Sequence, residues 1–217
     1  MPAPRLLAVL AVGAVTLASC SDPVYYQTPR EPDWELHVPA PPSVPEPESA
    51  IFFENRLEMR MVRVPAGTMV LGTPVGEAGR SPDEAIRTVS MPAFWVSQTE
   101  VTQAQFQALM GFNPSRFRDP DRPVENVLIT EALGFCAMLS AIDGRSYRLP
   151  DEDMWEFACR SGEGGAALPA VGIDSAPRRV EDTHRDSSGI HGMIGNVAEL
   201  CGNAYIPDPR LPMSEAS

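Results

Sequence analysis

The chain is poor in basic residues: Lys and Arg together number 17 against 29 Asp and Glu, for a formal net charge of −12. That charge has the wrong sign for a surface that binds nucleic acid or anionic lipid headgroups, so we expect no nucleic-acid partner. The chain also lacks an apolar run of the about 20 residues that a membrane-spanning helix needs. Its N-terminal apolar stretch, residues 6–17, follows Arg5 and ends in small residues. This pattern predicts a signal peptide over residues 1–19.

The residues that close this segment, Leu17-Ala18-Ser19-Cys20, look like a bacterial lipobox. In this interpretation the signal peptide is removed and Cys20 becomes the lipidated first residue. Several acyl chains would anchor the protein stably, since each buried methylene contributes about 0.8 kcal/mol. We therefore expect attachment to a membrane through Cys20, with the domain facing the periplasm or the cell exterior. Ser21 favours the outer membrane where two membranes are present. The alternative is an ordinary signal peptide with an incidental cysteine.

Proline marks the flanks of the expected folded region. Residues 20–50, which begin with the lipidated Cys20, are rich in proline, and such a composition favours an extended, semi-rigid tether. Residues 51–205 have a normal size for one folded domain. Residues 206–217 contain prolines and few apolar residues, and they are predicted to be a flexible tail.

Periodicity and capping signals predict an α+β domain with long loops. Residues 59–64 approach the alternation of a strand, and residues 65–67 supply a turn. Thr102 followed by Gln105 is a capping-box pattern that begins a helix. A second helix is expected to begin at Thr130. The positions expected to face the core are Phe106, Leu109 and Met110 in the first helix, and Ala132, Phe135, Cys136 and Leu139 in the second.

Residues 147–160, YRLPDEDMWEFACR, are the most informative stretch of the chain. Asp151 can accept hydrogen bonds from the first free amides of a helix, as an N-cap does. Trp155, Ala158 and Cys159 then fall on one face at i, i+3 and i+4 spacing. The pattern predicts a third helix here, with Trp155 as a buried anchor.

The same stretch resembles the RLPTEAEWEYA segment of the formylglycine-generating enzyme family, also called the sulfatase-modifying factor family. Other blocks resemble further segments of that family, in the family's order: VPAGTMVLG at 64–72, FWVSQTEVT at 94–102, NPSRF at 113–117, RPVENV at 122–127 and GNVAEL at 195–200. The resemblance implies an α+β, loop-rich, C-type-lectin-like fold over residues 51–205. The family's later RGGSW and GFR segments do not occur in the sequence, so we expect this fold to be incomplete at the C-terminus.

Members of the family oxidise a cysteine of a target sulfatase to formylglycine, with copper held by a cysteine pair in the C-terminal third of the domain. A thiolate pair suits Cu(I) because metal and ligand are both soft. Cys136, Cys159 and Cys201 lie upstream of that region and none of them matches the pair. The resemblance therefore gives no reason to expect copper in this chain. We interpret the three cysteines as buried thiols, or as one disulfide with one cysteine left over.

The resemblance also implies a calcium site in the GNVAEL block. Its ligands would be the backbone carbonyls of Gly195 and Val197 and the carboxylate of Glu199, a set of oxygen atoms that suits a hard cation. A further family ligand, usually Asn or Asp, is replaced by Gly192. The alternative is that Glu199 is a buried carboxylate that accepts hydrogen bonds and binds no metal.

Two functions follow from these expectations. The first is a membrane-anchored extracytoplasmic lipoprotein whose domain is a non-catalytic binding or scaffold module, with a protein or peptide as partner. The second is a sulfatase-maturing oxidase, in a truncated form or with its missing part supplied by another chain. The absence of the cysteine pair favours the first.

Overall fold

The computed structural model describes residues 8–9, 13–14, 51–73, 85–164 and 176–203. Cys20, the tether over residues 20–50 and the tail over residues 206–217 lie outside the described residues. Within the described residues, no helix combines the length and the apolar character that crossing a membrane requires.

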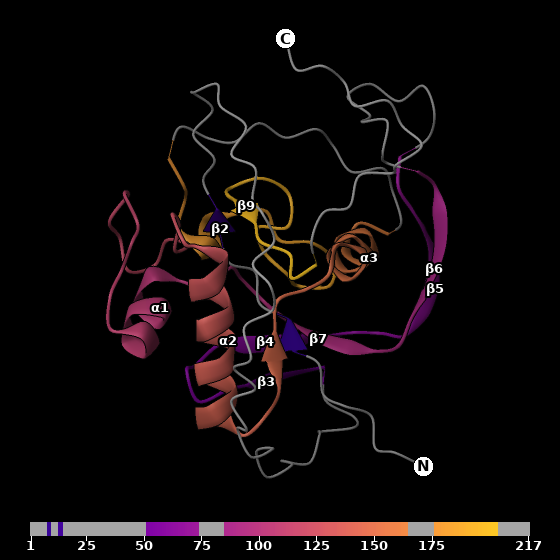
Figure 1. Ribbon diagram of the computed structural model, residues 1–217. Helices are drawn as coiled ribbons and strands as arrows, with labels where there is room; N and C mark the ends of the chain where they lie inside the picture. The colour runs from indigo at the N-terminus through magenta and orange to yellow at the C-terminus, as the bar shows by residue number, and fades with distance from the viewer. Residues whose placement is uncertain (1–7, 10–12, 15–50, 74–84, 165–175, 204–217) are drawn as a thin grey trace, which may run out of the picture.

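A five-stranded sheet forms the centre of the domain, in the order β3-β4-β7-β1-β8 (Figure 1). Strand β4 pairs antiparallel with both β3 and β7, whereas β1 lies parallel to both of its neighbours, β7 and β8. The bounds of these strands are Phe52–Glu54 (β3), Arg60–Val64 (β4), Phe94–Ser97 (β7), Ala8–Val9 (β1) and Tyr147–Arg148 (β8). The expected strand over residues 59–64 is therefore present as β4, and it is joined to a sheet that contains an N-terminal segment.

Two smaller antiparallel pairs lie beside this sheet. Strands β5 (Gly67–Leu71) and β6 (Arg87–Met91) form an arm at the side of the domain where α3 lies (Figure 1). At the end of β5, Gly72 N donates a hydrogen bond of 2.7 Å to Glu156 Oε1 in α3, which ties the arm to the helix. Strand β2 (Gly13–Ala14) pairs with β9 (Ala198–Glu199).

Three α-helices and a short 3₁₀ helix complete the described fold: α1 (Gln103–Met110), α2 (Ile129–Asp143), α3 (Glu152–Gly162) and η1 (Val180–Asp182). The capping box that begins α1 is confirmed, because Thr102 Oγ1 accepts from Gln105 N and Gln105 Oε1 accepts from Thr102 N. The N-cap of α2 is Leu128 and not Thr130, so the predicted start was wrong by two residues. Glu131 Oε2 accepts a 2.8 Å hydrogen bond from Leu128 N, which satisfies the amide without a polar N-cap side chain.

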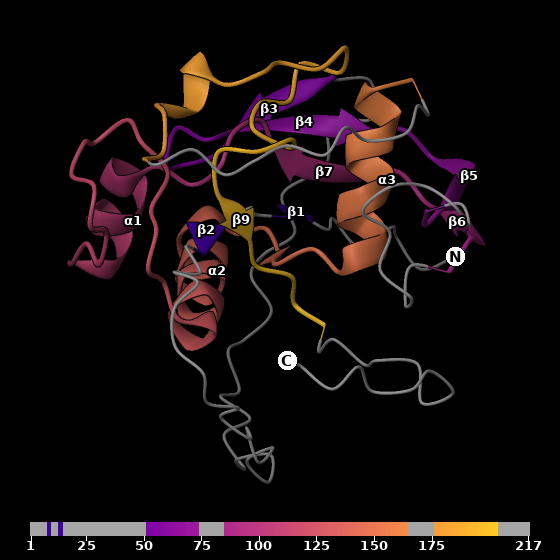
Figure 2. The same cartoon turned by 90° about the horizontal axis from the view of Figure 1, so that it is seen from above.

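The sheet separates two hydrophobic cores. Met61 and Trp95 belong to the first core, whereas their neighbours Val62 and Val96 belong to the second, as the alternation of side chains along a strand requires. The first core receives residues from α1 and α2, and the second receives residues from α3. In both views α1 and α2 lie on one side of the domain and α3 on the other (Figure 2).

The face of α3 that is buried differs from the expected one. Met154, Phe157, Ala158 and Cys159 are buried, whereas Trp155 is only partly buried against the second core. The indole of Trp155 reaches the loop that carries Glu199 and donates a hydrogen bond to its carboxylate. The prediction that Trp155 is a fully buried anchor was therefore wrong, because the indole is used for a polar contact at the edge of the core.

Candidate functional site

The GNVAEL block forms a tight turn that brings two distant carboxylates together. Gly192, Gly195 and Asn196 all have positive φ, at 77°, 91° and 61°. This left-handed backbone is open to glycine and is tolerated by asparagine. The Asn196 side chain fixes the turn from inside: its Nδ2 donates to Glu100 Oε1 at 2.9 Å, and its Oδ1 accepts from Arg178 N at 2.7 Å.

Glu100 enters this site from the loop between β7 and α1. Its side chain is fully buried, and burial raises the pKa of its carboxyl group to about 7 even though the hydrogen bond from Asn196 opposes the shift. Only Oε1 has a hydrogen-bond partner; Oε2 is buried and has none in the part of the chain that the structure describes. A buried carboxylate oxygen without a partner is energetically unfavourable. A hydrogen-bond donor or a cation at this oxygen would therefore stabilise the site.

Glu199 has a similar arrangement at the other side of the site. Its Oε2 accepts from Trp155 Nε1, and its Oε1 is buried and finds no partner among the described residues. The residue as a whole is partly exposed, but burial of the carboxylate, with the nearby charge of Glu100, raises its pKa to about 8. The structure therefore places beside Glu199 a second acidic group that the sequence analysis did not identify as a site residue.

Glu100 also explains the glycine at position 192. A β-carbon on Gly192 would lie 2.4 Å from Glu100 Oε1, closer than real β-carbons approach an oxygen. The Glu100 carboxylate therefore fills the space beside position 192, where members of the family usually carry an Asn or Asp side chain.

The donor set fits a hard cation. Two carboxylates each have one buried oxygen without a partner, and oxygen atoms of this kind are the ligands that Ca²⁺ prefers. Gly195 and Val197, whose carbonyls the family resemblance assigns to the same site, stand directly before and after Asn196 in the turn that leads into β9. Glu100 lies in the TEVT block, but nothing in that block indicates which distant loop the residue meets, so the sequence alone does not identify it as a site residue.

The cysteines do not form a pair. Cys136 belongs to the first core and Cys159 to the second, so the sheet lies between them, and Cys201 is partly exposed. All three are free thiols, and burial raises the pKa of each to about 12, which keeps them protonated at neutral pH. Among the residues that the structure describes, no group of three or more His, Cys, Asp and Glu side chains could hold a metal ion.

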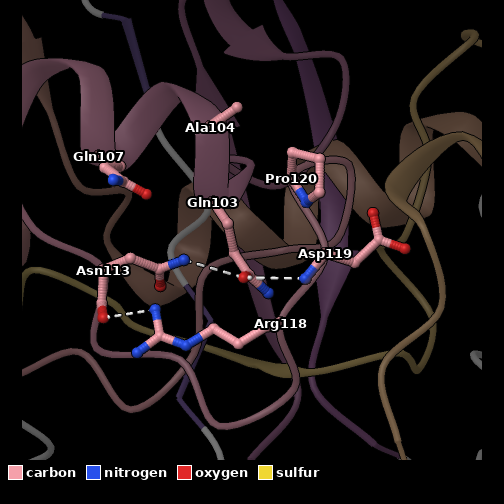
Figure 3. A pocket seen from close by; sticks show the side chains of 7 residues that line it. All are labelled: Gln103, Ala104, Gln107, Asn113, Arg118, Asp119 and Pro120. Carbon is pink, nitrogen blue, oxygen red and sulfur yellow. Dashed lines mark hydrogen bonds between the residues drawn. The ribbon is translucent and has the colours of Figure 1, made fainter.

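A surface cavity of about 280 Å³ lies beside α1, where the NPSRF and RPVENV blocks wrap around the helix (Figure 3). Gln103 lies in its wall and is almost fully buried; its Oε1 accepts from Asn113 Nδ2 at 3.0 Å and from Asp119 N at 3.2 Å. Its Nε2 donates to Phe117 O at 2.7 Å. These bonds hold the loop to the helix and use the polar groups of Gln103, so we interpret the cavity as a product of loop packing.

The central sheet, the helices on its two sides and the GNVAEL turn define a domain with the fold of formylglycine-generating enzymes. Residues 49–214 match the Sulfatase-modifying factor enzyme 1-like domain, and the chain belongs to this family. The family resemblance and the α+β, loop-rich fold expected from the sequence are thereby confirmed.

Solved structures of similar fold agree with this assignment. PvdO from Pseudomonas aeruginosa is 21% identical, with a TM-score of 0.56 over 65% of this chain and 70% of that one. Variable protein 1 of Treponema denticola is 25% identical, with a TM-score of 0.57 over 69% and 75% of the two chains. CarF is 22% identical, with a TM-score of 0.52 over 70% and 84%.

A curated relative matches a shorter part of the chain. The chaperone protein LppX of Paenibacillus barcinonensis is 40% identical over 50 residues, which make up 23% of this chain. The chain covers 18% of the length of that relative.

Proposed function

We propose that this protein is an extracytoplasmic lipoprotein, anchored at Cys20, whose domain binds a polypeptide partner and does not generate formylglycine. The observation that carries the non-catalytic part is the separation of Cys136 from Cys159 by the central sheet, with both thiols buried and protonated. A copper centre needs two thiolates that converge on one metal and remain open to substrate. The name of the relative LppX, a chaperone protein, agrees with a binding role.

The catalytic part of the proposal is tested with a peptide that carries a sulfatase cysteine motif. Purified protein is loaded with copper, mixed with the peptide under oxygen, and the peptide mass is followed. We expect no loss of mass at the target cysteine. Turnover that disappears when Cys136, Cys159 or Cys201 is changed to Ser would establish the alternative function, a sulfatase-maturing oxidase with a rewired metal site.

Anchoring is tested by intact mass spectrometry and membrane fractionation. The wild-type protein is expected to begin at a lipidated Cys20 and to partition into membranes, with the domain outside the cytoplasm. Cys20→Ala should accumulate as a larger, unprocessed precursor. Ser21→Asp is the matched control for sorting: it should keep the lipid but move the protein from the outer to the inner membrane. An unchanged mature mass in Cys20→Ala would reject the lipoprotein assignment.

The unpartnered oxygens of Glu100 and Glu199 support a second proposal, that the domain binds calcium for its stability. The two carboxylates and the carbonyls of Gly195 and Val197 would bind the ion. The ion would be the positively charged partner of the two buried oxygens that have no hydrogen bond. Calcium that binds only the folded protein raises its melting temperature.

We expect millimolar calcium to raise the melting temperature relative to chelator, and Glu199→Gln to reduce that gain. Glu125→Gln is the control, since Glu125 is also an acidic residue with a buried carboxylate but accepts its hydrogen bonds from the 116–117 backbone, away from the site. Equal melting temperatures of the wild-type protein in calcium and in chelator would remove the calcium site.

A further inference from the structure

The centre of the sheet is filled by a segment that the proposed processing removes. Strand β1, residues Ala8–Val9, lies between β7 and β8 and pairs with both. In Figure 2 it lies near the centre of the domain. These two residues belong to the apolar run that the sequence analysis assigned to the signal peptide. Without them β7 and β8 have no described strand between them.

The neighbouring residues of β7 and β8 indicate which side chains a strand at this position can carry. Ala8 is in register with Trp95 on one side and Tyr147 on the other, and both aromatic residues are buried in the first core. The next position, Val9, is in register with Val96, which is buried in the second core. Its neighbour on the other side is Arg148, whose side chain is 41% exposed, so the face of Ala8 is covered more completely than the face of Val9. Parallel strands at the centre of a sheet favour apolar residues on their covered faces. A small residue is also favoured between the two large aromatic residues.

The same N-terminal segment reaches the candidate cation site. Strand β2 pairs with β9 in a register that sets Gly13 opposite Glu199 and Ala14 opposite Ala198. The N-terminal region thus supplies one short strand to the central sheet and a second short strand to the loop that carries Glu199. Its removal would leave both positions vacant at once.

We propose that the position between β7 and β8 is a receptor for an extended apolar strand of a partner polypeptide, parallel to both neighbours, which the N-terminal segment occupies until it is cleaved. This inference rests on the proposed processing at Cys20. A vacant central position spans about two interstrand spacings, roughly 9–10 Å, and leaves backbone groups of β7 without ladder partners, whereas the backbone N and O of Tyr147 in β8 also bond to the Ser140 hydroxyl. Added strands bind through such backbone groups, while side-chain pockets select the sequence.

The proline-rich segments on either side of the domain are poor candidates for this position. Residues 206–217 contain Pro207, Pro209 and Pro212, and proline cannot donate to a strand ladder. The proline-free run at residues 34–38, WELHV, alternates apolar with polar residues, so it would place Glu35 and His37 in one of the two cores. A partner strand without this alternation fits better.

The experiment compares two forms of the whole protein in the same detergent: the processed wild-type protein and the uncleaved Cys20→Ala precursor. The probe is a synthetic peptide of residues 5–15, RLLAVLAVGAV, extended by lysines for solubility. Two control peptides carry Val9→Pro, which removes a ladder amide, or Ala8→Asp, which places a charge between Trp95 and Tyr147.

We expect the processed protein to bind the probe at one-to-one stoichiometry and the precursor, whose position is filled, to bind it at least about tenfold more weakly, a difference of about 1.4 kcal/mol. Both control peptides should lose at least about tenfold in affinity. Hydrogen exchange of residues 94–97 should be faster in the processed protein than in the precursor and should slow again when the probe binds.

Four results would overturn the inference. Processed protein whose residues 94–97 are already as protected as in the precursor would mean that its own chain fills the position. Equal binding of the probe and the control peptides would mean that the peptides only partition into micelles. Wild-type protein that retains residues 1–19 by intact mass would overturn the proposed processing as well, whereas failure to bind in a correctly processed protein would overturn only the partner strand.

Discussion

The Glu100 carboxylate and the α-carbon of Gly192 lie so close that a side chain at position 192 would collide with it: a β-carbon there would be 2.4 Å from Glu100 Oε1. Glu100 cannot move aside easily, because it is fully buried and accepts a hydrogen bond from Asn196. Position 192 also has a φ of 77°, which L side chains rarely adopt. Two independent restraints therefore select glycine here.

This relationship predicts that Gly192→Ala destabilises the protein more than a second glycine substitution at the same backbone conformation. Gly111, the C-cap of α1, has a φ of 79° but nothing within 4 Å of the position of a β-carbon. Gly111→Ala should cost only the left-handed strain, about 1–2 kcal/mol. Gly192→Ala should cost about 1–3 kcal/mol more because of the added overpacking.

Urea denaturation of both variants measures the difference. Adding Glu100→Ala to Gly192→Ala should recover part of the loss, since the two positions are in contact and their effects are not additive. Equal costs for the two glycine substitutions would show that the carboxylate does not occupy the space next to Gly192.

Glu125 is expected to stabilise the loop that contains the NPSRF block. Its Oε1 accepts from the backbone amides of Arg116 and Phe117, the latter at 2.8 Å, and the side chain is almost fully buried. Glu125→Ala should cost about 1.5–3 kcal/mol, the range for hydrogen bonds to charged groups. Glu125→Gln keeps an acceptor oxygen and should cost less. The measurement is chemical denaturation together with limited proteolysis between residues 113 and 122, and the prediction fails if both variants unfold like the wild-type protein.

Asp143 predicts a pH dependence of stability. Burial alone would raise the pKa of its carboxyl group, but hydrogen bonds from Tyr147 Oη, Arg145 and Arg56 N outweigh burial and lower it below the usual 3.8. A carboxyl group with a lowered folded-state pKa contributes stability that is fully present above its unfolded-state pKa and is lost as the pH falls through the folded-state value.

The stability difference between the wild-type protein and Asp143→Asn should therefore be constant at neutral pH and shrink as the pH falls from about 5 towards 2. Denaturation curves of both proteins across this range provide the measurement. A difference that stayed constant down to the lowest pH would mean that the charge of Asp143 does not contribute, and that only its size and hydrogen-bond geometry matter.

The local parts of this structure could be predicted from the sequence. The capping box of Thr102 and Gln105 depends on residues three positions apart, and Gly111, which ends α1, has the left-handed conformation that is common for a glycine at this position. The start of α2 was misplaced because Glu131 satisfies the amide of Leu128 from within the helix, so no polar side chain marks the N-cap. Capping rules identify ends that use a side chain at the N-cap and miss those that do not.

The pairing of Glu100 with Glu199 could not be predicted in the same way. The family blocks identify each of the two residues, but only the tertiary fold shows that the loop after β7 meets the turn before β9 and that Asn196 links them. The position of residues 8–9 at the centre of the sheet could not be predicted either. A short apolar run is typical both of a signal peptide and of a buried strand, so the sequence does not distinguish the two.

Helical periodicity predicted that Trp155 is buried in the core, whereas the structure places it at the edge of the core. Because its indole is partly exposed and donates to Glu199, its contribution should come from the hydrogen bond as well as from packing. Trp155→Phe removes the donor and keeps an aromatic ring, so it should cost about 1–3 kcal/mol, the penalty for an acceptor left without its partner. In Glu199→Ala, which removes that acceptor, the same substitution should cost less.

Phe106→Ala is the reference for a fully buried aromatic residue, with an expected loss of about 3–5 kcal/mol. Trp155→Ala should fall below that range if the indole lies at the edge of the core, and within it if the indole is a core anchor. Urea denaturation of the Trp155 variants, with and without Glu199→Ala, decides between these environments. An equal cost of Trp155→Phe in both backgrounds would show that the indole stabilises the domain by packing alone and that the contact with Glu199 contributes nothing.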